Sequence, residues 1–567
     1  MKCAADHSGC FDAKLERIVY SRIWTMSTKL VLRWWARLKW LPRYLYRADG
    51  ITRLRSRHND APPNHPSLTT FQTRRCILLA LLSSIALSFS ALATASAQQM
   101  NVNIRIASDS SRVIVEGRSA PASAWSFLDS YASIVGLGNR FERFTLIDED
   151  GNEIQPRKIA PGQFDSPKPA ARFRYEVSLK PPLMAPDSAM VSWVNNDRGL
   201  LMLADLLPLS FRRDGNSANA IIRFTLPPQW RAYSSEIAKG QNEFEVRDAG
   251  QAVFAVGSQL RTSQINESGM LFNLVTDGEW AFSDREALEL AGKILKAHRE
   301  VFGTMPAGQA SLILFPFPQA VGPSQWSAET RRSTVTLLMG KLPSKVGALA
   351  QLSTPVTHEF FHLWVPNALA LEGDYDWFYE GFTVYQAAQT ATQLGMLTFP
   401  EFLTSIARAY DASKTEAGEW SLVEASTRRF TIGRTSVYSK SQVVAFLYDL
   451  RLRSLSHNKK SLADVYRRLI REHPAPGDSS RAGKTNDGTD VVTKELSAEI
   501  RSDDFVRLFI RSPVSIDLSA ALAPFGLKVE TVGLRTRIGV DEKIGKQQRD
   551  LLRQLGYNDA TRGPRSK

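Results

Sequence analysis

The hydrophobic pattern of this chain changes its period near Ser283, and this change constrains the fold more than any other feature. From Gln98 to about Asn266, apolar residues alternate over short spans such as VNIRIA, RFRYEVSL and AIIRFTL, separated by Asp-Gly and Pro-Pro turns. Alternation with a period of two is typical of half-buried strands, so we expect an antiparallel β domain over residues 98–266. This domain contains no clustered His, Cys or repeated carboxylates, and we interpret it as a packing and shaping domain.

A helical pattern begins at Ser283. Residues Ser283 to Glu286 have the form of a capping box, and the run LELAGKILKAHREVFG that follows has apolar residues at helical spacing. His298 stands on the apolar face of this predicted helix. We therefore interpret it as a structural histidine, and a role as a metal ligand is the alternative.

Strands and helices then mix. The runs SLILFPF (311–317) and STVTLLMG (333–340) are strand-like, and helices dominate from there to about residue 473. We expect an α+β protein in which the β domain is followed by a domain over residues 267–475 with a mixed sheet and a helical lobe. Residues 474–494 have the composition of an exposed loop, and we expect residues 476–567 to hold this loop, a helical closing segment and a tail.

The net charge of +14 would suggest a nucleic-acid partner if the basic residues were spread over the folded chain, but they are not. Residues 1–97 hold 15 Lys or Arg against 5 Asp or Glu, whereas residues 98–567 hold 56 against 52. The basicity therefore belongs mainly to the leader, and we expect no nucleic-acid partner. Cys3, Cys10 and Cys76 also lie in the leader, so any metal further along must be held by His and carboxylates.

The leader resembles a secretory signal in everything but its position. Arg74 and Arg75 precede an apolar run over residues 76–93, and small residues end at Ala97, after which we expect cleavage. The mature protein is then periplasmic or secreted, and an uncleaved membrane anchor formed by residues 76–93 is the alternative. The basic, aromatic stretch at residues 29–47 is explained by a start codon assigned too early, or by an interfacial membrane segment.

The motif THEFFHLW places two imidazoles and a carboxylate within about one helical turn. Thr354 is suited to cap a helix and Pro355 to be its first residue, so we expect a short helix that starts here. His358 and His362 are four residues apart and share one face of such a helix, where both can reach one metal ion. Glu359 is displaced by about 100° around the helix axis, so it can act on a water molecule instead of binding the metal.

A third ligand is expected downstream, because a catalytic zinc takes three protein ligands and keeps one position for water. The run DWFYEGFTVYQAAQTATQLG predicts a helix that Asp376 caps and Gly395 ends. Glu380 then lies in the first turn among aromatic residues, an unusual setting for a carboxylate. The 17 residues between His362 and Glu380 allow the chain to return to the same ion. A solvent-facing Glu380 that stabilises the helix N-terminus is the alternative.

His358, His362 and Glu380 therefore form a predicted site for one zinc ion per chain, since two imidazoles and one carboxylate suit zinc best. Zinc lowers the pKa of a bound water towards about 7 and polarises a carbonyl group. Glu359 would take the proton of that water and deliver it to the leaving amine. These residues predict a zinc peptidase.

The sequence also resembles a known family. HEFFHLW followed by WFYEGFTVY is similar to the gluzincin metallopeptidases, and most closely to the glycyl aminopeptidase family, whose pattern is HExFHxWN followed by WFxEGFTxYY. The run that starts at Tyr438, YSKSQVVAFLYDLRLR, resembles the tyrosine-bearing helix of that family. The resemblance covers about residues 277–527. Relatives often end in a PDZ domain, which is not expected here because too few residues follow Leu527.

The resemblance implies a thermolysin-like catalytic domain and assigns Tyr438 to stabilisation of the transition state. From the residues alone, Tyr438 stands just ahead of an amphipathic helix, so an ordinary interfacial tyrosine is the alternative. Tyr385 and Tyr410 are weaker rivals for the catalytic role.

Relatives also carry a glutamate that resembles the residue holding the free amine of the substrate in related aminopeptidases. The corresponding stretch here, QWSAETRRSTV, retains Glu329 but has Thr330 in place of a histidine. Arg331 and Arg332 stand beside Glu329 and are able to neutralise it. The resemblance implies that Glu329 binds the substrate amine. Because the two arginines could neutralise it instead, both exopeptidase and endopeptidase action stay open.

We expect a zinc-dependent peptidase that acts as an aminopeptidase on peptide or protein substrates. The strand around residues 333–338 is expected to be an edge strand that pairs with extended substrate, with the β domain closing one side of the cleft. A non-catalytic peptide-binding protein on a gluzincin scaffold and a zinc hydrolase of a non-peptide bond are the alternatives. The sequence gives no indication of the oligomeric state.

Overall fold

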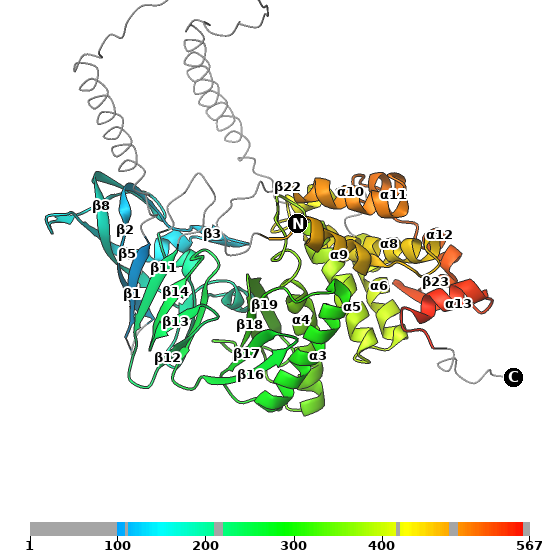
Figure 1. Cartoon of the computed structure of the whole chain (residues 1–567), viewed down its shortest axis with the longest axis horizontal. Coiled ribbons are helices and arrows are strands. Elements are labelled where there is room, and N and C mark those ends of the chain that lie inside the picture. Colours follow the sequence, from blue (N-terminus) through cyan, green and yellow to red (C-terminus); the bar gives the residue numbers. More distant parts are fainter. Residues whose placement is uncertain (1–98, 108–110, 209–218, 415–419, 476–485, 559–567) are drawn as a thin grey trace, which may run out of the picture. The chain divides into compact units, whose positions relative to one another are not determined.

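The computed structural model describes residues 99–107, 111–208, 219–414, 420–475 and 486–558 (Figure 1). The predicted signal, the alternative anchor at residues 76–93, the cleavage site after Ala97 and the three cysteines lie outside these residues. Within the described ranges, no helix combines the length and the hydropathy of a membrane span.

A nine-stranded sheet forms the first layer, with strands in the order β13-β14-β11-β1-β2-β8-β5-β6 and with β7 paired to β8. The strands are β1 (Met100–Ile106), β2 (Arg112–Ser126), β5 (Phe141–Ile147), β6 (Glu153–Ile154), β7 (Arg157–Ala160), β8 (Gln163–Ser178), β11 (Ala220–Thr225), β13 (Ile237–Gly240) and β14 (Glu243–Val246). Neighbouring strands are antiparallel except β1 and β11, which are parallel. The expectation of a wholly antiparallel domain is wrong at this pair, because alternation predicts a strand but not the direction of its neighbour.

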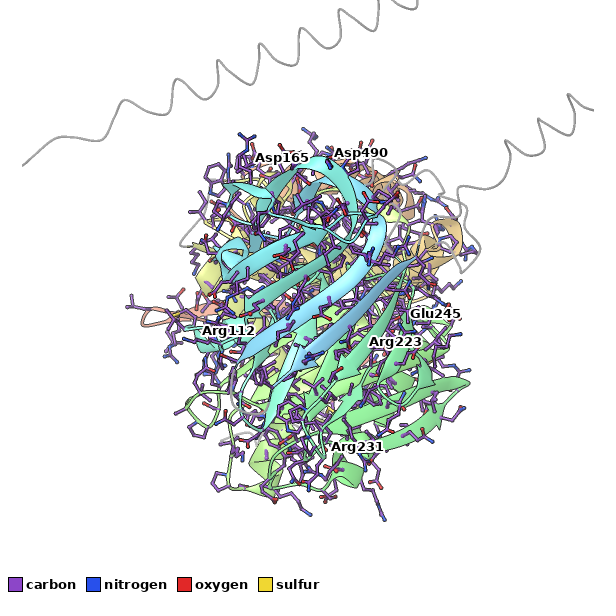
Figure 2. The ribbon with its side chains drawn as sticks, turned by 90° about the vertical axis from the view of Figure 1, so that its left-hand side faces the viewer. Arg112, Asp165, Arg223, Arg231, Glu245 and Asp490 are labelled. Atoms are coloured by element: carbon purple, nitrogen blue, oxygen red, sulfur yellow. The ribbon has the colours of Figure 1, made fainter. Side chains whose placement is uncertain are left out.

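Burial confirms the alternation within these strands. Every second residue of β1 is buried, and burying one large aliphatic side chain contributes about 1.5–3 kcal/mol. Figure 2 is turned to this side of the molecule and shows the strands crossing the view, with Arg112, Arg223 and Glu245 among the charged side chains on them. Arg223 pairs across the strands with Glu243 at 3.0 Å. One face of the sheet is therefore polar and the other belongs to the core.

A four-stranded sheet lies behind it and contributes to two cores. Its order is β12-β15-β10-β9, with β9 (Trp193–Val194), β10 (Arg198–Met202), β12 (Arg231–Tyr233) and β15 (Val253–Gly257). Leu201 and Phe254 belong to the core of the nine-stranded sheet. Their neighbours Leu200 and Ala255 point to the other side and pack with a third sheet. This sheet is therefore the middle layer between the two larger ones.

The third sheet has five strands in the order β16-β17-β18-β20-β19. These are β16 (Arg261–Glu267), β17 (Met270–Thr276), β18 (Gln309–Pro316), β19 (Trp326–Arg331) and β20 (Thr334–Met339). The two predicted strands correspond to β18 and β20. The expectation that residues 333–338 form an edge is wrong, because β20 pairs with β18 on one side and β19 on the other. The edge strand on this side of the sheet is β19, and β16 forms the other edge.

Two helices pack on this sheet, α3 (Asp284–Phe302) and α4 (Lys345–Phe361). The capping box of α3 is confirmed, since the backbone N–H of Ser283 donates to Glu286 at 2.9 Å and that of Glu286 donates back to the serine hydroxyl. His298 is a structural histidine, as expected. It is fully buried, and its Nε2 lies 2.9 Å from the carbonyl oxygen of Thr357 in α4.

The remaining described residues form the helical lobe and shorter elements. The lobe contains α5 (Thr383–Gln393), α6 (Phe399–Ser413), α7 (Leu422–Ser426), α8 (Ser441–Leu455), α9 (Leu462–Glu472), α10 (Gly488–Ile500), α11 (Asp504–Phe509), α12 (Leu518–Leu522), α13 (Lys546–Arg553) and the hairpin of β23 (Leu527–Val532) and β24 (Arg535–Val540). Shorter elements are β3 (Ser130–Tyr131), β4 (Ile134–Val135), η1 (Leu137–Arg140), η2 (Ala185–Ala189), η3 (Leu203–Asp205), β21 (Leu371–Glu372), β22 (Asn486–Asp487) and η7 (Ala523–Phe525). Figure 1 shows the lobe on the side of the five-stranded sheet away from the nine-stranded one.

The predicted loop over residues 474–494 ends earlier than expected, because α10 starts at Gly488. The carboxylate of Asp487 caps this helix by accepting the backbone N–H of Asp490 at 2.8 Å. Val492 is fully buried in the core. A polar, glycine-containing stretch that predicts a loop is here the start of a helix.

Candidate metal centre

The HExxH motif lies at the end of α4, with His362 as the C-cap of the helix. The helix starts ten residues before the predicted one, with Ser344 in place of Thr354 as its N-cap. Pro355, expected at the first helical position, stands inside the helix. A proline there removes one backbone hydrogen bond. Ala348 and Leu352 in the preceding turns are buried in the core, and this packing keeps the helix continuous.

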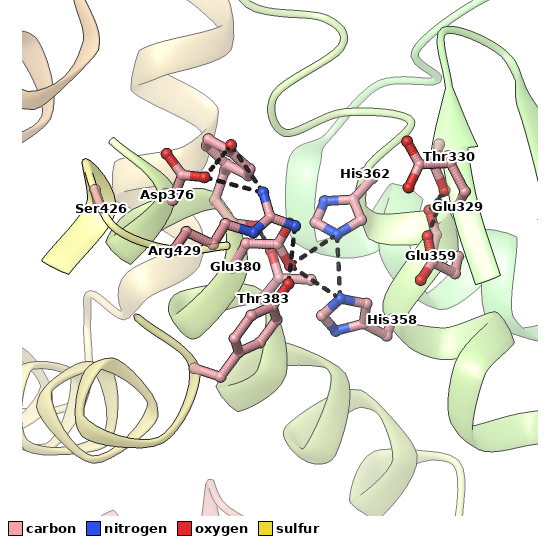
Figure 3. Close-up of polar contacts among 12 residues, drawn as sticks. Glu329, Thr330, His358, Glu359, His362, Asp376, Glu380, Thr383, Ser426 and Arg429 are labelled. Carbon is pink, nitrogen blue, oxygen red and sulfur yellow. Dashed lines mark hydrogen bonds and ion pairs between the residues drawn. The ribbon is translucent and has the colours of Figure 1, made fainter. Parts of the chain in front are cut away.

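Three side chains converge where α4 meets a π-helical turn, η4 (Trp377–Phe382) (Figure 3). The Nε2 atoms of His358 and His362 are 3.1 Å apart, and Glu380 Oε2 lies 3.4 Å from the first and 3.5 Å from the second. Nδ1 of His362 is 2.9 Å from the carbonyl oxygen of Val365, an arrangement that keeps a proton on Nδ1 and leaves Nε2 to bind a metal. The structure thus brings together the three residues predicted as ligands.

The spacing of these atoms fits a metal ion. Ligand atoms about 2.0–2.1 Å from a tetrahedral zinc are about 3.3–3.4 Å from one another. The observed separations of 3.1, 3.4 and 3.5 Å are close to that value. Two imidazole nitrogens and one carboxylate oxygen are also a donor set that zinc prefers.

The electrostatics of the cluster favour a cation beside Glu380. Burial would raise the pKa of Glu380, but Arg429 and His362 outweigh it and hold the pKa well below its usual value. For His362, burial lowers the pKa, yet the carboxylate of Glu380 raises it to about 9. A negative carboxylate with a positive partner therefore suits this place, and a metal ion provides the same charge balance.

Asp376 does not cap the helix that carries Glu380, contrary to expectation. Its carboxylate accepts the hydroxyl of Tyr379 at 2.6 Å and pairs with Arg429 at 2.9 Å. The backbone N–H of Trp377 donates instead to the hydroxyl oxygen of Ser426, at 2.9 Å. The neighbouring helix α7 therefore provides the hydrogen-bond acceptor for the first backbone N–H of η4, and Asp376 pairs with Arg429.

A second π-helical turn, η6 (Ser436–Lys440), packs closely against η4. A Cβ at Gly381 would lie 2.1 Å from the Cβ of Ser441 and 2.5 Å from the carbonyl oxygen of Val437, so only glycine allows this approach. The contact brings Tyr438, on η6, beside Glu380.

Tyr438 is linked to Glu380, one of the three predicted metal ligands, through Arg429. Nη2 of Arg429 donates to the hydroxyl oxygen of Tyr438 at 2.8 Å and to Glu380 Oε1 at 2.6 Å. Burial raises the pKa of Tyr438, so its phenol stays protonated and is able to donate a hydrogen bond. The role in transition-state stabilisation that the family resemblance implies for Tyr438 stays a prediction.

The rival tyrosines serve other parts of the core. Tyr385 donates to the carboxylate of Asp449 at 2.6 Å, and that carboxylate also pairs with Arg453. Tyr410 donates to the carbonyl oxygen of Ile516 at 3.0 Å. Both hydroxyl hydrogens are therefore used away from the metal cluster.

Glu359 stands apart from the three ligands. Its carboxylate accepts the hydroxyl of Thr330 on β19 at 2.7 Å. Figure 3 shows Glu359 with Thr330 on the β19 side of the imidazoles and Glu380 on the opposite side. The residue that replaces a family histidine therefore holds the carboxylate predicted to be the base.

Glu329, also on β19, is already engaged by the protein. Its carboxylate accepts the hydroxyl of Tyr131 on β3, and it lies 3.9 Å from Nε of Arg331. The guanidinium of Arg331 also covers the ring of Tyr131 at 4.3 Å. Burial raises the pKa of Glu329, and Arg331 and Tyr131 only partly oppose it. Of the two predicted neutralising residues, Arg331 makes this contact.

Sequence reasoning missed Arg429 and Tyr131. Arg429 follows Arg428, and no sequence pattern indicates which of the two contacts the predicted metal ligands. In the structure Arg428 stacks on the ring of Trp420 at 3.9 Å and Arg429 makes the contact. Tyr131 precedes Glu329 by 198 residues in a short strand with no motif. The one available signal is physical: a buried carboxylate requires a donor or cationic partner, whose identity the sequence does not give.

Comparisons with known proteins extend these observations at the level of fold. No protein-family model matches the chain, and no curated protein matches it significantly. Its structure is similar to that of an aminopeptidase N family protein from Idiomarina loihiensis, with 17% identity, a TM-score of 0.64, and 76% of this chain and 79% of that chain covered. An M1 zinc metallopeptidase from Deinococcus radiodurans, solved as a mutant with a Tyr-Ser-Ala substrate, has 14% identity, a TM-score of 0.49, and coverage of 74% and 95%. The same enzyme without that substrate gives 14% identity, a TM-score of 0.48 and the same coverage. At such identity, what this chain shares with the Idiomarina protein is the fold.

Proposed function

We propose that this protein is a zinc-dependent peptidase, with His358, His362 and Glu380 as the metal ligands. Zinc held by such a set supplies Lewis-acid activation of water and of a carbonyl group. Glu359 accepts a proton from the attacking water and delivers it to the leaving amine. Tyr438 donates from its hydroxyl to the oxyanion that develops on the substrate.

The observation that carries this proposal is the separation of roles within one motif. Two imidazoles of α4 and the carboxylate of Glu380 face one point at ligand spacing, whereas Glu359 from the same helix turns to β19. A purely structural ion pair has no need of a second buried carboxylate held beside it. The fold shared with an aminopeptidase N family protein supports the same reading.

We propose further that the enzyme is an aminopeptidase whose Glu329 binds the amino terminus of the substrate. Neighbouring side chains of a strand point to opposite faces, but the charge of Glu359 contributes to the raised pKa of Glu329, so the two carboxylates lie near each other. An amine at Glu329 would therefore lie close to the base that Thr330 holds. Tyr131 and Arg331 already contact the carboxylate. The bound amine must therefore share the carboxylate with these two side chains.

For location, we propose secretion into the periplasm or the medium after cleavage following Ala97, on the sequence pattern described above. Amino-terminal sequencing of the protein recovered from a periplasmic extract tests this. A mature chain that still contains the apolar run at residues 76–93 would support the membrane-anchored alternative.

The function is tested with purified wild-type protein, Glu359→Gln, and the control Glu289→Gln on the exposed surface of α3. Aminoacyl reporters, internally quenched peptides and their N-acetylated forms are assayed with and without chelator, and zinc is measured per chain. We expect about one zinc in all three proteins, hydrolysis in wild type and Glu289→Gln, and none in Glu359→Gln.

The possible results separate the alternatives. Full activity in Glu359→Gln would refute the assignment of the base, and activity without metal would refute the zinc mechanism. A wild-type protein that binds zinc and peptides but cleaves none is a non-catalytic binding protein. Cleavage of ester substrates alone indicates a hydrolase of a non-peptide bond, and equal cleavage of acetylated and free peptides indicates an endopeptidase.

A further inference from the structure

Arg429 lies between the metal cluster and Tyr438, and its guanidinium contacts four side chains. Nη1 pairs with Asp376 at 2.9 Å and donates to the hydroxyl of Tyr379 at 3.0 Å. Nη2 lies 2.6 Å from Glu380 Oε1 and 2.8 Å from the hydroxyl oxygen of Tyr438. Only 18% of the side chain is exposed. Figure 3 shows the guanidinium between Asp376 and Glu380.

The first consequence concerns Glu380. Because Arg429 occupies Oε1, the carboxylate offers the imidazoles its other oxygen, and Oε2 is indeed the atom 3.4 and 3.5 Å from them. Hydrogen bonds to the second oxygen of a ligating carboxylate fix its orientation. Asp376 pairs with the other terminal nitrogen, Nη1, so the guanidinium group cannot rotate away from Glu380.

The second consequence concerns Tyr438. A phenol has one hydrogen to donate, and its oxygen here receives an N–H from Arg429. Among the described residues, no acceptor is found for the hydrogen of Tyr438 itself. Tyr438 is only partly buried, so this hydrogen can be donated to an acceptor on the substrate. Arg429 thus sets the phenol to donate.

We propose that Arg429 is a positioning residue that uses one nitrogen, Nη2, both to present Oε2 of Glu380 to the metal and to direct the hydroxyl of Tyr438 at the substrate oxyanion. The inference rests on the proposed zinc peptidase function and adds to it a coupling between metal binding and oxyanion stabilisation. Arg429 itself touches neither the metal nor the reacting atoms.

The adjacent arginine supplies a matched control. Arg428 carries the same charge one residue away, but it stacks on Trp420 at 3.9 Å and has no contact with the cluster. Arg428→Met and Arg429→Met therefore remove the same group from the same loop. A general electrostatic effect would appear in both variants, whereas positioning appears in Arg429→Met alone.

The first measurement is zinc affinity, by competition with a chromogenic chelator on the purified full chain. Loss of a residue that orients a metal ligand typically weakens metal binding by about 10–100-fold. We expect a loss of that size in Arg429→Met and no change in Arg428→Met. Wild-type zinc affinity in Arg429→Met would overturn the assignment to Glu380.

The second measurement is a double-mutant cycle for kcat at saturating zinc, with Tyr438→Phe as the other change. Removing an oxyanion donor typically lowers kcat by about 10²–10³-fold. If Arg429 acts through the phenol, the double variant is no slower than Tyr438→Phe alone. Losses that multiply in the double variant would overturn the assignment to Tyr438.

Arg429→Lys guards against misfolding, because it keeps a positive charge between two buried carboxylates. Its ammonium lacks the planar fork, so we expect it to recover zinc affinity more fully than kcat. Recovery of kcat to the wild-type value would contradict the proposed direction of the phenol. If wild-type protein binds no zinc and cleaves no peptide, the proposed function fails. If wild type does both and Arg429→Met behaves as Arg428→Met does, only the role of Arg429 fails.

Discussion

The helix that carries the metal ligands is predicted to lose stability in mild acid, because His298 is buried beneath it without charge. Burial lowers the pKa of His298 from 6.5 to about 4, and its hydrogen bond to the carbonyl of Thr357 offsets this only in part. In the unfolded chain His298 binds a proton below about pH 6.5, whereas in the folded protein it stays neutral to about pH 4. The stabilisation is therefore complete above pH 6.5 and is lost as the pH falls towards 4.

The magnitude follows from the shift. About 2.5 pKa units at 1.36 kcal/mol each give about 3 kcal/mol between pH 7 and pH 4, a large part of the stability of an ordinary domain. The assay is denaturant unfolding of wild type and His298→Gln at several pH values, with chelator present so that protons and metal do not compete. The side chain of glutamine is able to donate to Thr357 but does not titrate. We expect the wild type to lose about 3 kcal/mol more than His298→Gln over this range, and parallel pH profiles would refute the reasoning.

Three further predictions concern residues around the predicted metal ligands and Glu329. Tyr131→Phe removes a hydrogen-bond donor from Glu329 and so raises the pKa of Glu329 further. The KM for peptides with a free amino terminus should rise about tenfold, and more at pH 6 than at pH 8. The KM for acetylated peptides should not change. Thr330→Val removes the hydroxyl that holds Glu359, so kcat should fall about tenfold at unchanged zinc content. Gly381→Ala places a methyl group 2.1 Å from a side-chain carbon of α8, so thermal unfolding should show a loss of about 1–3 kcal/mol together with weaker zinc binding.

The metal ligands could be predicted because their geometry is local. His358 and His362 are fixed relative to each other by one turn of helix, whatever the rest of the fold does. Glu380 required one more step, a carboxylate in an aromatic helical run, and the structure places it against the imidazoles. The strands at β18 and β20 were likewise visible as apolar runs. Neither is an edge strand, because β20 pairs with β18 and with β19, and no local pattern encodes this pairing.

The helix boundaries were wrong where tertiary contacts replace local signals. Thr354 and Pro355 have the form of a helix start, but α4 begins at Ser344, because buried residues before the proline favour a continuous helix. Asp376 also has the form of a cap. The hydroxyl of Ser426 takes that place, and Asp376 pairs with a buried guanidinium instead.

The two residues that the sequence did not predict, Tyr131 and Arg429, come from different domains, and this limits what local reasoning can reach. Tyr131 belongs to the β domain, which sequence analysis credited with packing and shaping alone, whereas Arg429 follows a short helix of the lobe. Tyr131 meets Glu329 at the junction between the β domain and β19, where Ser327 and Arg331 of β19 also donate to the carbonyl oxygens of Pro186 and Met190. The ligands on α4 and η4 do not depend on that junction. A change that loosens it should therefore release Glu329 while zinc stays bound, so selectivity for amino termini should be lost before metal binding is.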